Sequence, residues 1–252
     1  MNERDQAEIE RSASEALKVE LKDVRTERYM QPPADTAYPL EYAFHLLGDV
    51  RGQKVLDLGC GSGENIIPLL RRGADVIAID ISPELIAAAT ARVSMAGLQA
   101  SIRVGSAYET GIAEGSIDIV FCMSLVHHLD IAVVREEIKR VLAPAGRLVL
   151  KEPVRFSQIY NRLRALLPSQ EDVSEYEHPL TRSELALLSE GFDIEGMRYF
   201  RLPFVPFAER MLRIESSKVW RASNWALQRA KTLERYATSV VASLRKQTGR
   251  VN

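Results

Sequence analysis

The sequence predicts an α/β protein built on an open, doubly wound sheet of mostly parallel strands. Beginning at Gln53, short apolar runs alternate with stretches whose apolar residues recur every three or four positions. This alternation is typical of strand–helix–strand units, in which helices cover both faces of a parallel sheet. The chain has 252 residues, of which 46% are hydrophobic and 27% charged, so it is long and apolar enough to bury a substantial core.

Two helices are expected ahead of this core. Residues 3–28 place apolar side chains every three or four positions among many charged ones, as on one stripe of a surface helix. The proline-containing stretch 31–35 ends that pattern, and a second helix follows around residues 40–47, ending near Gly48. We therefore assign residues 1–52 to N-terminal cap helices.

The core, residues 53–153, contains five expected strands that are separated by helices or turns. Right-handed connections make such strands wind into an open sheet whose ligand sites lie at the carboxyl ends of the strands. The expected strands are 54–58, 76–79, 101–104, 117–122 and 147–153, and the expected helices are 64–72, 83–96 and 133–142.

The pattern is less regular in residues 154–252. We assign this segment to substrate-side helices, a helical lid insertion and the last two strands of the same structural domain. The second of its helices has Thr181 or Ser183 as its cap residue, and the final strand is a β-branched run. The expected helices are 154–168 and 181–189, the helical insertion is 203–235, and the expected strands are 192–202 and 236–244.

The charge and the cysteine content argue against several classes of protein. The 33 Lys and Arg against 34 Asp and Glu give a net charge of -1, so binding to a nucleic-acid backbone is not expected. Cys60 and Cys122 form no CxxC pair, so we expect neither a metal site nor a disulfide scaffold, and a reducing cytoplasm fits best. There is no apolar leader and no run of about 18 apolar residues, so membrane insertion is not expected.

The most informative stretch reads Asp57-Leu58-Gly59-Cys60-Gly61-Ser62-Gly63, between a predicted strand and a predicted helix. Glycine permits a positive φ and lets a ligand approach the backbone, and the helix that follows presents unpaired N–H groups. Alone, the loop is also compatible with a tight turn that binds nothing. Asp80, however, lies 21 positions after Gly59 and ends the next strand, where a carboxylate can accept both hydroxyls of a ribose. Together the two features predict a nucleotide-type cofactor site.

Nicotinamide dehydrogenases use a related fingerprint, G-x-G-x-x-G, with an acid at the end of the second strand. Here the third fingerprint position is Glu64, and the third glycine comes one residue early, at Gly63. An acid, one residue and then G-x-G-x-G instead resembles the first motif of the class I S-adenosylmethionine-dependent methyltransferases. Asp57, Gly59, Gly61 and Gly63 match this motif at every position, and the resemblance covers residues 53 to about 153.

That resemblance implies a Rossmann-like sheet of seven strands with an antiparallel last strand, and S-adenosylmethionine as the cofactor. The glycine loop, with Asp57 and Cys60, would cradle the methionyl end of the cofactor, and Asp80 and Ile81 would lie at its ribose. Tyr29 would contact the amino-acid end of the cofactor or pack in the core. Where the family often has Gly-Asp-Ala at the adenine, this chain reads Gly105-Ser106-Ala107, so Ser106 departs from the family's Asp and could offer one hydroxyl hydrogen bond. Met123 would lie beside the methionyl group.

Two adjacent histidines follow the 117–122 strand, in a stretch that resembles the family's fourth motif in its small-molecule branch. Methyl transfer from a sulfonium is an in-line displacement, so positioning alone can supply about 7–11 kcal/mol. Phenol, alcohol and carbon acceptors also need a base, and imidazole titrates at about pH 6.5. His127 and His128 are therefore the candidate catalytic residues, and the resemblance favours His128. Their side chains are expected to point in different directions, and packing of the loop is the alternative role.

The predicted function is methyl transfer from S-adenosylmethionine to a small molecule, with oxygen favoured over nitrogen or carbon and S-adenosylhomocysteine as the other product. A non-catalytic S-adenosylmethionine-binding protein and, less favoured, a nicotinamide oxidoreductase are the alternatives. Glu152 and His178 are further residues that could reach the acceptor, unless Lys151 and Glu152 form a paired strand end and His178 lies in a surface loop. The basic and aromatic segment 203–235 is a candidate lid, homodimer face, lipid-contacting surface or solvated helix.

Overall fold

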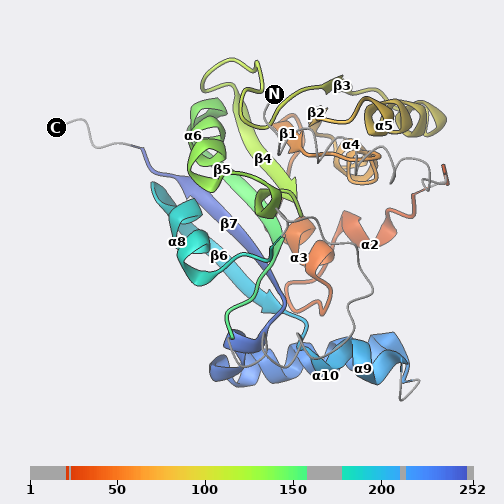
Figure 1. Cartoon of the computed structure of the whole chain (residues 1–252). Coiled ribbons are helices and arrows are strands. Elements are labelled where there is room, and N and C mark those ends of the chain that lie inside the picture. The colour runs from red at the N-terminus through yellow and green to blue at the C-terminus, as the bar shows by residue number, and fades with distance from the viewer. Residues whose placement is uncertain (1–20, 23, 158–177, 211–213, 249–252) are drawn as a thin grey trace.

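In a computed structural model, the chain forms one seven-stranded sheet with helices on both of its faces (Figure 1). The structure describes residues 21–22, 24–157, 178–210 and 214–248. The strands are ordered β3-β2-β1-β4-β5-β7-β6 across the sheet. Strands β1 to β5 pair in parallel, whereas β7 is antiparallel to both of its neighbours. This topology confirms the expected doubly wound sheet with an antiparallel last strand.

The elements have the following bounds. The strands are β1 Lys54–Leu58, β2 Asp75–Asp80, β3 Ser101–Val104, β4 Ile117–Met123, β5 Leu142–Pro153, β6 Phe192–Phe200 and β7 Ser239–Lys246. The α-helices are α2 Glu27–Met30, α3 Pro39–Leu46, α4 Ile66–Arg71, α5 Pro83–Met95, α6 Ile131–Val141, α8 Arg182–Ser189, α9 Phe204–Arg210 and α10 Ser216–Arg229, and two 3-10 helices are η1 Val126–His128 and η2 Lys231–Tyr236. None of the described helices is both long and apolar enough to cross a membrane.

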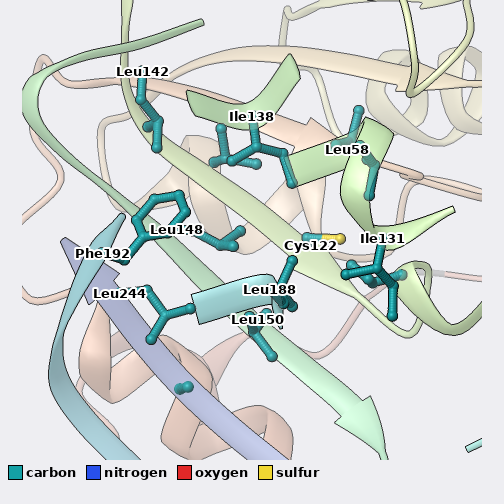
Figure 2. Close-up of a cluster of buried hydrophobic side chains, with 14 of the residues drawn as sticks. Leu58, Cys122, Ile131, Ile138, Leu142, Leu148, Leu150, Leu188, Phe192 and Leu244 are labelled. Carbon is teal, nitrogen blue, oxygen red and sulfur yellow. The ribbon is translucent and has the colours of Figure 1, made fainter. Parts of the chain in front are cut away.

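Side-chain alternation along the strands divides the core into two layers. Figure 2 shows the first layer, where Leu58, Cys122 and Leu150 meet Ile138 of α6 and Leu188 of α8. The second layer lies on the opposite face, where side chains such as Phe121 and Val149 pack against α3, α4 and α5. Each large apolar side chain buried in these layers contributes about 1.5–3 kcal/mol to stability. Two consecutive residues at the end of a strand therefore point into different layers.

The helical insertion expected at 203–235 consists of α9, α10 and η2, which lie between β6 and β7 in the sequence. Since β6 and β5 are both antiparallel to β7, β6 runs in the same direction as the parallel strands. The insertion therefore follows the carboxyl end of β6, and Figure 1 shows α9 and α10 beyond the tip of that strand. The insertion therefore lies at the end of the sheet where the parallel strands finish, which is also the end that carries the glycine loop.

Two expected helices need correction. For the helix at 3–28, residues 1–20 and 23 lie outside the described residues, and residues 24–26 are not helical, so the described part contains only the single turn of α2. For the helix at 154–168, residues 158–168 lie outside the described residues. Residues 154–157 are not helical, because Val154 forms a bridge with Leu180 and donates its N–H to the carbonyl of Thr238.

The remaining helix and strand at the C-terminal side agree with the sequence. The hydroxyl of Thr181 accepts a hydrogen bond from the N–H of Glu184, whose side chain accepts one from the N–H of Thr181, so Thr181 is the cap of α8. The last strand begins at Ser239 rather than at Tyr236, because Tyr236 ends η2.

Candidate functional site

The carboxyl ends of β1 and β4 are neighbours at the point where the strand order reverses. From β1 the chain builds β2 and β3 on one side of the sheet, and then returns to place β4 and β5 on the other side. The loops that leave β1 and β4 therefore diverge, and in open α/β sheets this is where ligands bind. The glycine loop follows β1, and the two histidines follow β4.

The three glycines of the loop all have a positive φ, but each meets a different environment. A Cβ at Gly59 would lie 2.8 Å from the side chain of Leu125, which follows β4, and a Cβ at Gly63 would lie 2.8 Å from Ala89 of α5. A Cβ at Gly61, where φ is +52°, would have no heavy atom within 4 Å. Gly59 and Gly63 thus permit close packing of protein on protein, whereas Gly61 faces open space in which a ligand can lie against the backbone.

Asp80 fixes the conformation of the loop. Its carboxylate accepts a hydrogen bond of 2.8 Å from the N–H of Gly61 and one of 3.0 Å from the N–H of Ser82. Ser82 in turn caps α5, because its hydroxyl accepts from the N–H of Leu85. The acid that the sequence predicts at the cofactor ribose is therefore held directly against the glycine loop.

Asp57 is a buried acid beside this loop. Its side chain is 1% exposed, and neither carboxylate oxygen has a hydrogen-bond partner among the described residues. Burial, together with the charge of Asp80, raises the pKa of Asp57 to about 7. A buried carboxylate without a donor is unfavourable unless a cation or a hydrogen-bond donor approaches it, so Asp57 suits the binding of a positively charged ligand group.

The raised pKa of Asp57 leads to a prediction about pH. Because the carboxyl titrates at about 3.8 when unfolded and at about 7 when folded, the native state holds a proton that the unfolded state has lost between these values. The free energy of unfolding should then fall as the pH rises from about 4 to about 7. Asp57→Asn should remove this fall and should be more stable than the parent at pH 8 by about 2–4 kcal/mol. Urea denaturation of both proteins at pH 5 and pH 8 measures the difference, and equal pH dependence would contradict it.

Glu152 organises the loop that follows β4. Its side chain is 0% exposed, and one oxygen accepts hydrogen bonds of 2.9 Å from the N–H groups of both Leu125 and Val126. The other oxygen lies 2.7 Å from Nδ1 of His127. Ser124, with φ of +59°, turns the chain at the end of β4 and donates its N–H to the carbonyl of Lys151. Glu152 therefore connects β5 to the loop that carries the candidate catalytic residues.

The two histidines lie side by side, which corrects the expectation that they point in different directions. Both belong to η1 and are 6% exposed, and their ring centroids are 3.9 Å apart. The tight 3-10 turn and the bond from Glu152 to His127 bring the rings together. Lys151 and Glu152 do not pair with each other, because strand alternation directs them into opposite layers.

The other predicted site residues are buried to different extents at the ends of the strands or in α2. Cys60 is buried in the glycine loop, and Met123 ends β4 and packs partly buried against the second core layer. Tyr29 of α2 is partly buried and its ring lies 4.8 Å from that of Phe44. The partly buried residues that follow β2 and β3 are Ile81, Ser106 and Ala107, and the hydroxyl of Ser106 accepts from the N–H of Tyr108.

His178 lies apart from this centre, on the surface. Its side chain is 56% exposed, and its ring lies 3.7 Å from Glu184 of α8. The sequence did not reveal the packing of Leu125 against Gly59 or the bonds of Glu152 to the loop. The strand alternation of β5 was the available signal for Glu152, because it places this carboxylate on the same side as Leu148 and Leu150.

Comparison with known proteins agrees with the fold and the loop. Residues 56–150 match the family model described as a methyltransferase domain. The chain is 32% identical over 163 residues to a ubiquinone biosynthesis O-methyltransferase of Psychrobacter arcticus, covering 59% of this chain and 63% of that relative. It is 32% identical over 174 residues to the enzyme of the same name from Xanthomonas euvesicatoria pv. vesicatoria, covering 64% of this chain and 72% of the relative. The chain thus spans less than two thirds of the first relative's length.

A solved structure with the same fold covers nearly the whole chain. The geranyl diphosphate C-methyltransferase of Streptomyces coelicolor A3(2) superposes with a TM-score of 0.64 over 98% of this chain and 99% of its own, at 14% identity. The sheet order and the loop after β1 define a Rossmann-like cofactor-binding protein. Together with the sequence identity to the O-methyltransferases, they show that the chain belongs to the class I S-adenosylmethionine-dependent methyltransferase family.

Proposed function

We propose that this chain transfers the methyl group of S-adenosylmethionine to an oxygen atom of a small molecule and releases S-adenosylhomocysteine. The observation that carries the proposal is the meeting of two loops: the side chain of Leu125, in the loop with His127 and His128, lies against Gly59 of the glycine loop. A cofactor along the glycine loop would therefore lie next to the histidines. The relatives named O-methyltransferase support oxygen as the acceptor atom.

The residues around the glycine loop fit this cofactor. Gly61 leaves open space beside the backbone, and Asp57 offers a buried carboxylate without a hydrogen-bond partner among the described residues. Such a carboxylate suits the α-ammonium of the methionyl group, and Asp80 suits the ribose hydroxyls. The partly buried ring of Tyr29, which interacts electrostatically with Glu64 just after the loop, can face a sulfonium cation. When bound, the cofactor supplies an electrophilic methyl group.

The chain's own residues prepare the acceptor. His128 takes the proton from the acceptor hydroxyl as a general base, and His127 positions the ring of His128, which lies 3.9 Å from its own. The carboxylate of Glu152 accepts a hydrogen bond from the Nδ1–H of His127 and so fixes the orientation of that ring. Holding the acceptor in line with the methyl group is the largest source of acceleration.

An assay with labelled S-adenosylmethionine and separate phenols, carboxylic acids and amines tests the proposal. We expect labelled product from at least one oxygen acceptor, detected by mass spectrometry. His128→Gln should lower kcat by about 100-fold or more and leave the affinity for S-adenosylhomocysteine unchanged, because a base assists only the proton transfer. A variant that works at the parent rate would show that His128 is not the base, and product from amines alone would contradict oxygen as the acceptor.

We also propose that the chain works in the cytoplasm. Cys60 and Cys122 are both buried free thiols, which supports a reducing compartment. The small-molecule acceptor is the partner that the site itself requires. A homodimer through the segment 203–235 stays a prediction, which size-exclusion chromatography with light scattering would measure.

A further inference from the structure

Lys151 lies near the carboxyl end of β5, between the two neighbouring strands. It pairs with Met123, the last residue of β4, and with Val241 of β7. Strand alternation puts its side chain in the same layer as Val149, on the face covered by α3. Glu152, the next residue, faces the opposite layer and is fully engaged with the loop after β4.

Lys151 lies where the side chains of β4 and β5 on this face of the sheet change from fully buried to partly buried. Two pairs of residues earlier in the strands, and on the same face, Phe121 and Val149 are completely buried, and Phe121 packs against Phe44 of α3. At the last pair, Met123 and Lys151 are only partly buried. Tyr29 also packs against Phe44, with ring centroids 4.8 Å apart. Lys151 therefore lies at the end of the strands beside Met123, which the sequence predicts at the methionyl group, and Tyr29 packs partly buried against the same core layer.

The ammonium of Lys151 forms no hydrogen bond and no ion pair with any residue in the described part of the chain. Burial lowers its pKa, only partly offset by the charge of Glu152. Taking a cation partly out of water without a partner is costly, and a ligand that brings a negative charge recovers this cost. An exposed surface lysine would gain little from the same partner.

We propose that Lys151 binds the deprotonated oxygen of the methyl acceptor. The inference rests on the proposed function and narrows it: an anionic oxygen placed between the ammonium and the sulfonium is favoured, whereas an ammonium-bearing acceptor is repelled. The acceptor class is therefore a phenolate or a carboxylate.

The chemistry balances without a further reactant. A phenol gives its proton to His128, whereas a carboxylate arrives deprotonated. The acceptor oxygen then forms the new bond to the methyl carbon while the carbon–sulfur bond breaks and its electrons stay on sulfur. Lys151 keeps its proton throughout and acts by stabilising the negative oxygen.

Calorimetric titration of the protein saturated with S-adenosylhomocysteine tests the inference. Benzoate represents the carboxylate class and 4-nitrophenolate the phenolate class, and benzyl alcohol is the neutral control. We expect at least one anion to bind the parent protein. Lys151→Met should bind that anion at least tenfold more weakly, and Lys151→Arg should retain most of the affinity because it keeps the charge.

Two controls distinguish a failure of this inference from misfolding of the variant and from a failure of the proposed function. Lys54→Met changes an exposed lysine at the opposite end of β1 and should bind the anion as the parent does. Affinity for S-adenosylhomocysteine should persist in Lys151→Met, which shows that the variant is folded; if it does not persist, the comparison of Lys151→Arg with Lys151→Gln takes its place. Equal anion affinity with and without the positive charge, or no anion binding by the saturated parent, overturns the inference alone. If the parent does not bind S-adenosylhomocysteine, both the proposed function and the inference are contradicted.

Discussion

Glu152→Ala is expected to abolish methyl transfer and to lower the free energy of unfolding by about 3–5 kcal/mol. The substitution removes the acceptor for the N–H groups of Leu125 and Val126 and the partner of His127 in a completely buried site. It leaves these donors without water or protein to replace the carboxylate. The loop that carries both histidines should therefore lose its conformation. Urea denaturation and the labelled methyl-transfer assay measure the two effects.

Glu152→Gln is the matched control. The amide oxygen can still accept from the two N–H groups, so the loss of stability should be smaller than for alanine. The amide nitrogen, however, would face Nδ1 of His127 as a second donor, and the histidine ring should lose its fixed tautomer. We expect reduced kcat with nearly unchanged affinity for S-adenosylhomocysteine. If the alanine variant were as stable and as active as the parent, Glu152 would not organise the loop.

Gly61→Val is expected to lose binding of S-adenosylhomocysteine while the domain stays folded. A Cβ at this position would meet no heavy atom within 4 Å, so a valine side chain would extend into the space in which the cofactor should lie. The φ of +52° adds strain of about 1–2 kcal/mol to any residue with a Cβ. Calorimetric titration measures the loss of binding, and thermal melting shows that the fold is retained.

Gly97→Val is the control that distinguishes the effect of backbone strain from the effect of a side chain in the cofactor space. Gly97 also has a positive φ, +66°, and its Cβ would also meet no atom within 4 Å, but it lies just after α5 and away from the glycine loop. The two variants should therefore lose similar stability, and only Gly61→Val should lose binding. Binding by Gly61→Val within threefold of the parent would show that this loop is not the cofactor cradle.

The central sheet was predictable because its signals are local. Each expected strand of the core lies within a strand of the structure, since the apolar runs and the glycine punctuation act over only a few residues. The positive φ at Gly59, Gly61 and Gly63 likewise follows from the choice of glycine. The antiparallel orientation of the last strand was predicted as well, because the resemblance of residues 53–153 to the methyltransferase family implied it.

Features that depend on distant residues were not predictable in the same way. Ala145 adopts a φ of +59° in the irregular first part of β5, a conformation that an alanine gives no reason to expect. The contact of Leu125 with Gly59, and the orientation of His127 toward Glu152, depend on how the carboxyl ends of β1, β4 and β5 lie next to one another. Alternation places Lys151 and Glu152 in opposite layers, but the helices and loops that each side chain meets are known only once the elements are packed together.

Calorimetric titration of the purified protein with S-adenosylhomocysteine is the most direct test of the central claim, with NAD as the competing ligand and Asp80→Ala as the variant. We predict binding with a dissociation constant on the order of micromolar, no binding of NAD, and markedly weaker binding by Asp80→Ala, because a charged acceptor for the ribose hydroxyls is lost. A preference for NAD, or the absence of any binding of S-adenosylhomocysteine, would contradict the assignment of the glycine loop as a site for this cofactor.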